Sequence, residues 1–307
     1  MGDLPVVTHV YQNHHLDTTR WYDFKPRPDD IVVATSYKSG TTFTQTIVAN
    51  LLFPDGNLPA PVMDFCPWVD FRMNPLDDMM AMLEAQPHRR SMKSHLPLDG
   101  LPYFKEVKYI AVSRDPRDVF MSLLNHHSSH PEGFFEAMNT MPRRVGDPFP
   151  RYVDDIKLNW RNWISKGWFD WESDGYPYWS HLRHAKTFWD HRHLPNILMV
   201  HFNDLLADLD GEMRRIANYL DIDVPARQWD AVVDRCTFSS VKKDPGKVVG
   251  SNTANAFKGG ADTFIHKGTN GRWVDVLDEE DFALYDAAMA KLPKDYAHWL
   301  QNGGAVD

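Results

Sequence analysis

The stretch that decides the fold is Ile31-Val-Val-Ala-Thr35 followed by Ser36-Tyr-Lys-Ser-Gly40 and Thr41-Thr-Phe43. Its first five residues form a continuous apolar run, which is typical of a strand buried on both faces of a parallel sheet. After a short turn, apolar residues recur at Phe43, Ile47 and Leu51, a spacing that predicts a helix. A strand, a glycine-bearing turn and a helix in this order favour an anion-binding loop.

Further apolar runs predict more strands, and helical patterns alternate with them. The expected strands are Ser91–His95, Tyr109–Ser113 and Ile197–His201, and the expected helices are Asp118–His127, Tyr178–His191 and Glu212–Leu220. This alternation indicates an α/β fold with a central parallel sheet flanked by helices. In such folds ligands bind where the carboxyl ends of strands meet the starts of helices.

The 307 residues contain no evident repeat or linker, so we expect a single domain over residues 1–307. A segment at about 131–176 is rich in proline and aromatic residues, and we expect it to be an insertion on the acceptor side. Its tryptophans, together with Trp179, either pack as a cluster under long loops or line an acceptor pocket. A second segment, at about 245–272, lacks periodicity and is expected to form a mobile lid loop.

Composition excludes several classes of protein. Lys and Arg number 33 against 42 Asp and Glu, a net charge of -9, which argues against nucleic acid as a partner. Only Cys66 and Cys236 are present, so neither a disulfide framework nor a zinc site is expected. With no signal-like N-terminus and no apolar stretch near the ~18 residues of a membrane span, we expect a cytoplasmic protein without an integral membrane segment.

The turn after the first strand carries several groups that could hold an anion. Lys38 supplies a cation, Gly40 allows close approach of the backbone, and the hydroxyls of Ser39, Thr41 and Thr42 are donors. Alternatively, the hydroxyls only cap the helix. The pattern is not that of a nucleoside triphosphatase, because Lys38 precedes the lone glycine rather than following it.

Two more places offer reactive or anion-binding side chains. Arg114 directly follows a predicted strand, where its guanidinium can fork onto a phosphate, and Ser122 lies two helical turns further on. Lys93 and His95 share one face if extended, so a cation and a titratable base would lie together. The alternatives are an Arg114–Asp118 ion pair, a packing role for Ser122 and a structural role for the histidine.

Together these motifs resemble the cytosolic sulfotransferase family, here as a bacterial-type member, whose donor is 3′-phosphoadenosine 5′-phosphosulfate (PAPS). Four elements occur in family order, namely Tyr37–Thr42, Lys93–Pro97, Arg114 with Ser122, and Lys267–Trp273. The similarity runs from about residue 30 to residue 273. It implies the P-loop-like sulfotransferase fold and a product, 3′,5′-bisphosphoadenosine (PAP).

The resemblance also implies a role for each site residue. Lys38 to Thr42 would hold the 5′-phosphosulfate, with Lys38 at the oxygen that bridges phosphorus and sulfur. The 3′-phosphate would be bound by Arg114, Ser122, Lys267 and Gly268, and the base by Phe43, Thr237 and Phe238. Lys93 and His95 match the catalytic lysine and histidine.

The sequence departs from the family pattern at several positions. His266 stands where the family has an arginine beside the 3′-phosphate, but we retain it as a donor-binding residue. Phe202 replaces a tyrosine that contacts adenosine. The dimer motif of many animal members is not found, so the oligomeric state is open.

We therefore expect in-line transfer of a sulfuryl group from PAPS to a hydroxyl, with His95 as the base and without a metal. The acceptor would be small or lipophilic, such as a phenol, an alcohol or a hydroxylated lipid. Two alternatives remain: an ATP-dependent phosphoryl transferase and a nucleotide-binding module without catalysis.

Overall fold

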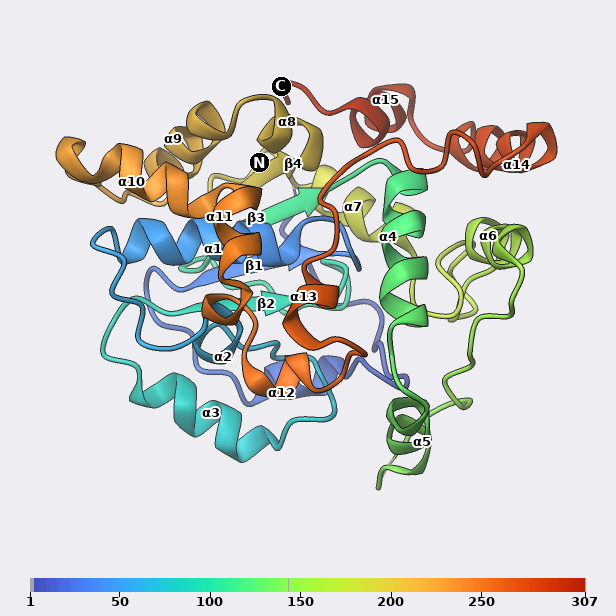
Figure 1. Cartoon of the computed structure of the whole chain (residues 1–307), viewed down its shortest axis with the longest axis horizontal. Coiled ribbons are helices and arrows are strands. Elements are labelled where there is room, and N and C mark those ends of the chain that lie inside the picture. The colour runs from blue at the N-terminus through green and yellow to red at the C-terminus, as the bar shows by residue number, and fades with distance from the viewer. Residues whose placement is uncertain (1–2, 143, 307) are drawn as a thin grey trace.

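The computed structural model describes residues 3–142 and 144–306. Residues 1, 2, 143 and 307, which the single-domain prediction also covers, lie outside the described part. One parallel sheet of four strands forms the centre, in the order β2-β1-β3-β4 (Figure 1). Its strands are β1 (Ile31–Thr35), β2 (Ser91–Ser94), β3 (Lys108–Ser113) and β4 (Ile197–His201). The α/β fold with a parallel sheet is confirmed.

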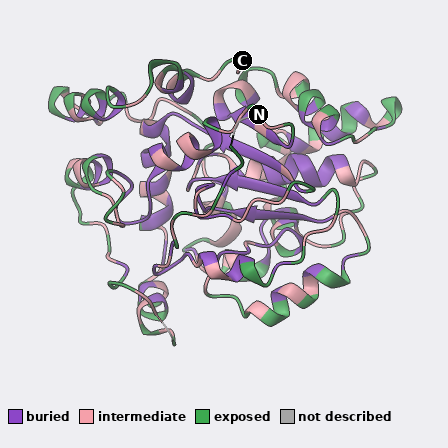
Figure 2. Ribbon diagram, turned by 180° about the vertical axis from the view of Figure 1, so that it is seen from behind, coloured by how far each residue is buried: buried purple, intermediate pink, exposed green. Residues whose placement is uncertain are grey.

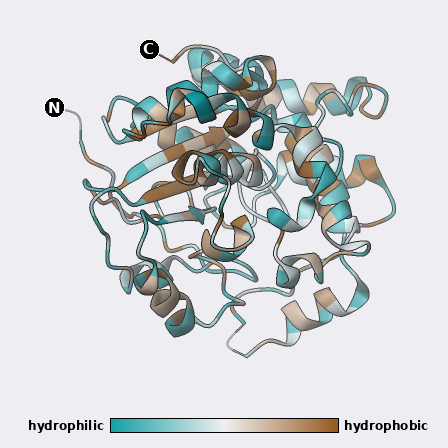
Figure 3. Ribbon diagram, turned by 60° about the vertical axis from the view of Figure 1, so that its left-hand side comes forward, coloured by the Kyte–Doolittle hydropathy of each residue, from teal (hydrophilic) through white to brown (hydrophobic). Residues whose placement is uncertain are grey.

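Strand side chains alternate between two cores. Ile31 and Val33 belong to one apolar cluster, whereas Val32 and Ala34 belong to another. Because successive strand residues point to opposite faces, a continuous apolar run requires cover on both sides. Figure 2 shows the strands almost entirely buried, and Figure 3 shows their apolar character.

Helices cover both faces of the sheet. On one side α1 (Thr41–Leu52) packs against α9 (Leu209–Tyr219) and α10 (Ala226–Cys236). On the other, α7 (His181–Trp189) contacts β3 and β4, while α6 (Ile156–Ser165) lies against α4 (Pro116–Ser128) and α14 (Glu279–Met289). Of these, α7 begins three residues later than predicted, because the Ser180 hydroxyl caps it by accepting from the N–H of Arg183.

The remaining helices are short or peripheral. They are η1 (Thr18–Tyr22), α2 (Val62–Phe65), α3 (Leu76–Ala85), α5 (Glu132–Thr140), α8 (Phe202–Ala207), α11 (Phe238–Lys243), η2 (Pro245–Lys247), α12 (Ser251–Ala254), α13 (Gly260–Phe264) and α15 (Lys294–Asn302). In the described part of the chain, no helix combines the length and the apolar character needed to cross a bilayer.

The parallel register brings three chain segments to one edge of the sheet. Ala34 pairs with Ser94 of β2, and Thr35 pairs with Val112 of β3. The residues that follow these strands therefore emerge side by side at their carboxyl ends. The segment 245–272, with η2, α12 and α13, passes in front of the sheet in the view of Figure 1.

Candidate active site

The turn between β1 and α1 has the backbone shape of an anion-binding loop. Lys38 (φ 61°) and Gly40 (φ 114°) both adopt left-handed conformations, and Gly40 immediately precedes the first helical residue. Turns that mix left-handed and ordinary residues direct successive N–H groups into one concavity, and the first N–H groups of α1 lack partners within the helix. A Cβ at position 40 would lie 2.9 Å from the Phe202 ring, so the loop has no room for a side chain there.

A cavity of about 950 Å³ opens over this loop, and it collects nearly all the residues predicted from the sequence. Those lining it are Lys38, Gly40, Thr41, Thr42, Phe43, Lys93, His95, Arg114, Ser122, Thr237, Phe238, His266, Lys267 and Gly268. Ser39 does not line the cavity. Its buried hydroxyl bonds to that of Ser36 at 2.8 Å, which leaves only its backbone N–H for an anion.

Burial lowers the pKa of three cations that line the cavity. Burial, together with the charges of Arg114 and Lys93, lowers the pKa of Lys38 to about 7. Burial also lowers the pKa of Lys93 to about 8 and that of Arg114 to about 10. Without a counter-ion these groups resist charging, so an anionic ligand would be drawn to them strongly.

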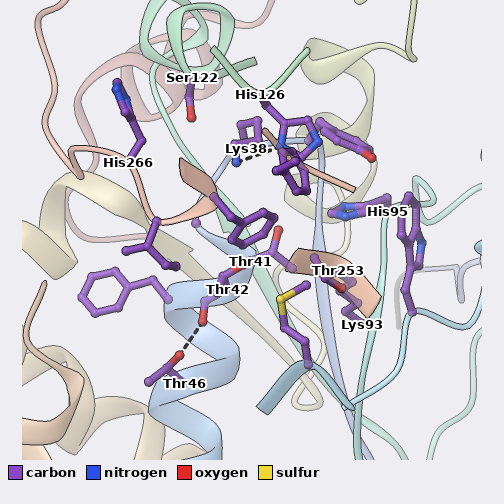
Figure 4. Close-up of a pocket in the computed structure, with 18 of the residues that line it drawn as sticks. Lys38, Thr41, Thr42, Thr46, Lys93, His95, Ser122, His126, Thr253 and His266 are labelled. Carbon is purple, nitrogen blue, oxygen red and sulfur yellow. Dashed lines mark hydrogen bonds between the residues drawn. The ribbon is translucent and has the colours of Figure 1, made fainter. Parts of the chain in front are cut away.

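His95 is a neutral base whose proton position follows from its contacts. Its Nδ1 lies 2.7 Å from the carbonyl oxygen of Thr35, which can only accept, so Nδ1 carries the proton and Nε2 keeps a lone pair. Burial above all, and then the charge of Lys93, holds the pKa of His95 well below its ordinary value. Among the described residues, no hydrogen bond engages Nε2. In Figure 4, Lys38 lies between the Lys93–His95 pair and the Ser122–His266 pair.

Arg114 joins the turn between β1 and α1 to the segment 245–272. Its Nε and Nη2 donate to Oδ1 of Asn270 at 3.0 and 2.6 Å, and Nη1 lies 3.4 Å from the carbonyl oxygen of Lys38. Asp118 on α4 also accepts from the N–H of Gly271 at 2.8 Å. Lys38 and Arg114 are therefore neighbours, as one nucleotide bridging them would require.

Aromatic rings frame the same region. A Cβ on Gly268 would lie 2.6 Å from the ring of Phe238, so the Lys267–Gly268 turn rests directly on that ring. Across the loop, the Phe43 and Phe202 rings are in edge contact at 6.1 Å. Flat apolar surfaces of this kind suit a purine base.

Arg272 also lines the cavity, although the sequence did not single it out as a site residue. Within the described part of the chain no hydrogen bond or ion pair engages its guanidinium. Together with burial, it lowers the pKa of the neighbouring His266, whose Nδ1 is buried without a partner. Arg272 thus supplies a permanent cation beside His266, which is neutral at high pH.

Away from these cations much of the cavity wall is apolar, although Asp64, Asn74 and Asp78 also line it. Its wall includes Met63, Met73, Met79, Met82, Phe71 and Phe134, with Trp68 beside His95 at a ring distance of 4.6 Å. Methionines adapt to irregular ligands. The tryptophans of the 131–176 segment are not part of this wall. Trp160 and Trp163 are fully buried in the core, and among the described residues of that segment only Phe134 reaches the cavity.

Three residues near the site were assigned no role from the sequence, although the segment 125–131, which contains His126, also resembles the family. His126 approaches Lys38, with 3.4 Å between its Nδ1 and the lysine Nζ. The buried Asp70 carboxylate accepts from the indole of Trp68 at 2.7 Å and from the backbone of His95 at 3.0 Å. His15 comes from the N-terminal segment and lines the cavity. His15 and Asp70 belong to stretches without periodicity, so only the folded chain brings them to the site. His126 lies on α4, in the predicted helix 118–127, which does not by itself indicate a place in the site.

The geometry defines a class of protein: an α/β protein with a cavity lined by buried cations at the carboxyl edge of a parallel sheet, where such folds bind their ligands. Residues 28–297 match the family described as the sulfotransferase domain. A glycolipid sulfotransferase of Mycobacterium tuberculosis is 30% identical, over 96% of this chain and 94% of its own length. Sulfotransferase 1A1 of Rattus norvegicus is 25% identical, over 89% of this chain and 87% of its own length.

A solved structure agrees in fold. Mouse sulfotransferase SULT7A1, complexed with PAP, has a TM-score of 0.67 at 18% identity, covering 92% of this chain and 90% of that one. The chain belongs to the sulfotransferase family and is a PAPS-dependent sulfotransferase. The resemblance drawn from the motifs is confirmed, and sulfuryl transfer is favoured over ATP-dependent phosphoryl transfer.

Proposed function

We propose that this enzyme transfers the sulfuryl group of PAPS to a hydroxyl of an apolar acceptor, a phenol, an alcohol or a hydroxylated lipid, with His95 as the general base. The observation that carries the proposal is the lone pair on His95 Nε2, fixed by the Nδ1 contact to Thr35 and open to the same cavity as Lys38. A neutral imidazole so placed can accept the hydroxyl proton as the oxygen attacks sulfur.

Donor binding would divide between two cationic groups. Lys38 and the N–H groups of residues 39–42 would take the 5′-phosphosulfate. Arg114, Ser122 and Lys267, with Arg272 as an added cation, would take the 3′-phosphate. The base would lie near Phe43, Thr237 and Phe238. The common cavity, the Lys38–Arg114 contact and the Gly268–Phe238 packing support this assignment.

Charge in the transition state would be stabilised in place. As the bond between sulfur and the bridging oxygen breaks, Lys38 would meet the charge on the departing phosphate, and Lys93 would steady the sulfuryl oxygens. We propose that no metal takes part, because these fixed cations already neutralise the group in transfer. We also retain the predictions of a cytoplasmic setting and of no nucleic-acid partner.

The acceptor class follows from the wall of the cavity. Methionine and phenylalanine side chains surround the end beyond His95, as a lipophilic acceptor would require. The glycolipid sulfotransferase of M. tuberculosis, at 30% identity over nearly the whole chain, makes a hydroxylated lipid the first acceptor to test.

The test is His95→Ala, assayed for sulfate transfer from PAPS to a panel of phenols, alcohols and hydroxylated lipids. Loss of the base should lower kcat by about 10²–10⁴-fold while PAP still protects the protein against heat. His298→Ala, at an exposed histidine on α15, is the matched control and should retain wild-type turnover. A kcat within a few-fold of wild type in His95→Ala would show that another group takes the proton.

A further inference from the structure

His15 is held rigidly at the acceptor end of the cavity. The N-terminal segment pairs with the loop between α2 and α3 through the bridge between Leu16 and Phe71. The side chain of Asn13 accepts from the backbone N–H groups of His15 and Leu16, each at 2.8 Å. His15 is only 1% exposed, so its imidazole has one fixed position in the wall.

A chain of hydrogen bonds assigns the proton of this imidazole. His14 Nε2 lies 2.9 Å from the carbonyl oxygen of Pro177, which can only accept, so Nε2 of His14 carries its proton. In neutral His14 the other nitrogen, Nδ1, then has a lone pair and must accept from Nδ1–H of His15. His15 is left with a lone pair on Nε2.

That lone pair has no partner in the part of the chain that the structure describes. Among the described residues no hydrogen bond reaches Nε2 of His15, although the residue lines the cavity. Burial, and then the neighbouring His14, holds the pKa of His15 well below its ordinary value, so the ring remains neutral and accepting. A buried acceptor that faces a ligand cavity is costly unless the ligand donates to it.

The same aromatic rings connect His15 with His95. The Trp68 indole lies 4.6 Å from the His95 ring and 6.3 Å from the His15 ring. The Tyr37 ring lies 4.9 Å from the His95 ring and 6.1 Å from the His15 ring. The rings of Trp68 and Tyr37, inclined at 67° to each other, thus lie beside two neutral imidazoles, each with a free lone pair on Nε2.

We propose that His15 is a specificity-determining residue that accepts a hydrogen bond from a second hydroxyl of the acceptor. The acceptor is then a polyol or sugar headgroup on an apolar tail, rather than a monohydroxylated compound. One hydroxyl of the headgroup meets His95 and is sulfated, while another donates a hydrogen bond to His15. The sugar ring lies along the indole of Trp68. This inference rests on the proposed function, since it takes His95 as the site of transfer.

Recognition can be measured apart from turnover. Binding of n-octyl β-D-glucopyranoside and of octan-1-ol, which share the tail, is measured by calorimetry on PAP-loaded protein. Wild type should bind the glucoside at least about tenfold more tightly. His15→Phe, which fills the same space without an acceptor, should reduce that preference by about ten- to a hundredfold. His15→Gln, whose amide oxygen accepts, should restore part of it.

His298→Phe is the matched control and should leave the preference unchanged. A PAP-induced rise in melting temperature verifies that each variant is folded. The proposal is overturned if wild type does not prefer the glucoside, or if His15→Phe weakens both ligands equally. If the glucoside binds as expected but receives no sulfate from PAPS, the proposed function fails, whereas the role of His15 as a hydrogen-bond acceptor for the ligand is retained.

Discussion

The protonation of Lys38 gives the most searching test of the donor site. Its pKa of about 7 comes from burial and from the charges of Arg114 and Lys93. A bound 5′-phosphate would supply the missing counter-charge and raise this pKa toward the ordinary value of about 10.4. Because the pKa rises on binding, PAP binding takes up a proton, and affinity is lost as the pH rises through the pKa of the free site.

The size of the effect follows from these values. In the free site, Lys38 is about half protonated at pH 7 and about 1% protonated at pH 9. If Lys38 stays protonated in the complex, Kd for PAP should therefore rise about 50-fold between these two pH values. PAP itself does not interfere, since its phosphates titrate near pH ~6. Nor does Arg114, whose pKa is about 10. Lys93 is expected at the sulfuryl group, which PAP lacks.

Calorimetry in two buffers of different ionisation enthalpy measures both Kd and the protons taken up. Uptake should be about half a proton at pH 7 and about 0.9 at pH 8. Lys38→Arg should bind with nearly constant Kd over this range, and Lys38→Met should bind weakly with no such slope. A wild-type Kd that changes less than threefold between pH 7 and 9, or an unchanged slope in Lys38→Met, would refute the reasoning.

Two further predictions concern the loop and the 3′-phosphate. Gly40→Ala should lower the free energy of unfolding by about 2–4 kcal/mol in urea titrations, because φ is 114° and the new Cβ would press on Phe202; a loss below about 0.5 kcal/mol would contradict this. Arg272→Gln should weaken the binding of PAP by about 10–100-fold but that of 5′-AMP, which has no 3′-phosphate, by less than about twofold. Arg227→Gln, at an exposed arginine, is the control. Equal losses of affinity for both nucleotides would show that Arg272 does not bind the 3′-phosphate.

The sheet could be predicted from the sequence because its strands are covered on both faces. A run such as Ile31–Thr35 has no polar face, and few other structures accommodate it. The strand order could not be predicted, since nothing in a strand's own sequence says which neighbour it pairs with. Helix α8 was missed because its six residues, Phe202–Ala207, begin directly after β4 and show less than two turns of periodicity.

The donor end of the site was predictable for a different reason. Arg114 directly follows β3, and Lys38 and Gly40 lie in the short turn after β1, so the register of a parallel sheet was enough to bring them together. The acceptor end depends on long-range contacts. His15 reaches the cavity only because the N-terminal segment pairs near Phe71, and composition could not distinguish core tryptophans such as Trp160 from those of a pocket wall.

Burial has opposite consequences at the two ends of the cavity, and this difference explains the choice of side chains. At the donor end, lysine and arginine stay available for charging in spite of burial, so a polyanion gains by neutralising them together. At the acceptor end the same burial keeps His15 and His95 neutral, because an imidazole loses its charge first. We therefore expect the donor to be held by charge, whereas a hydroxylated acceptor lacks the negative charge that such binding requires. We expect the acceptor to be held by directed hydrogen bonds, which distinguish one hydroxyl arrangement from another. Lysines in place of these histidines would draw anions to both ends, and the sulfated product would then be retained.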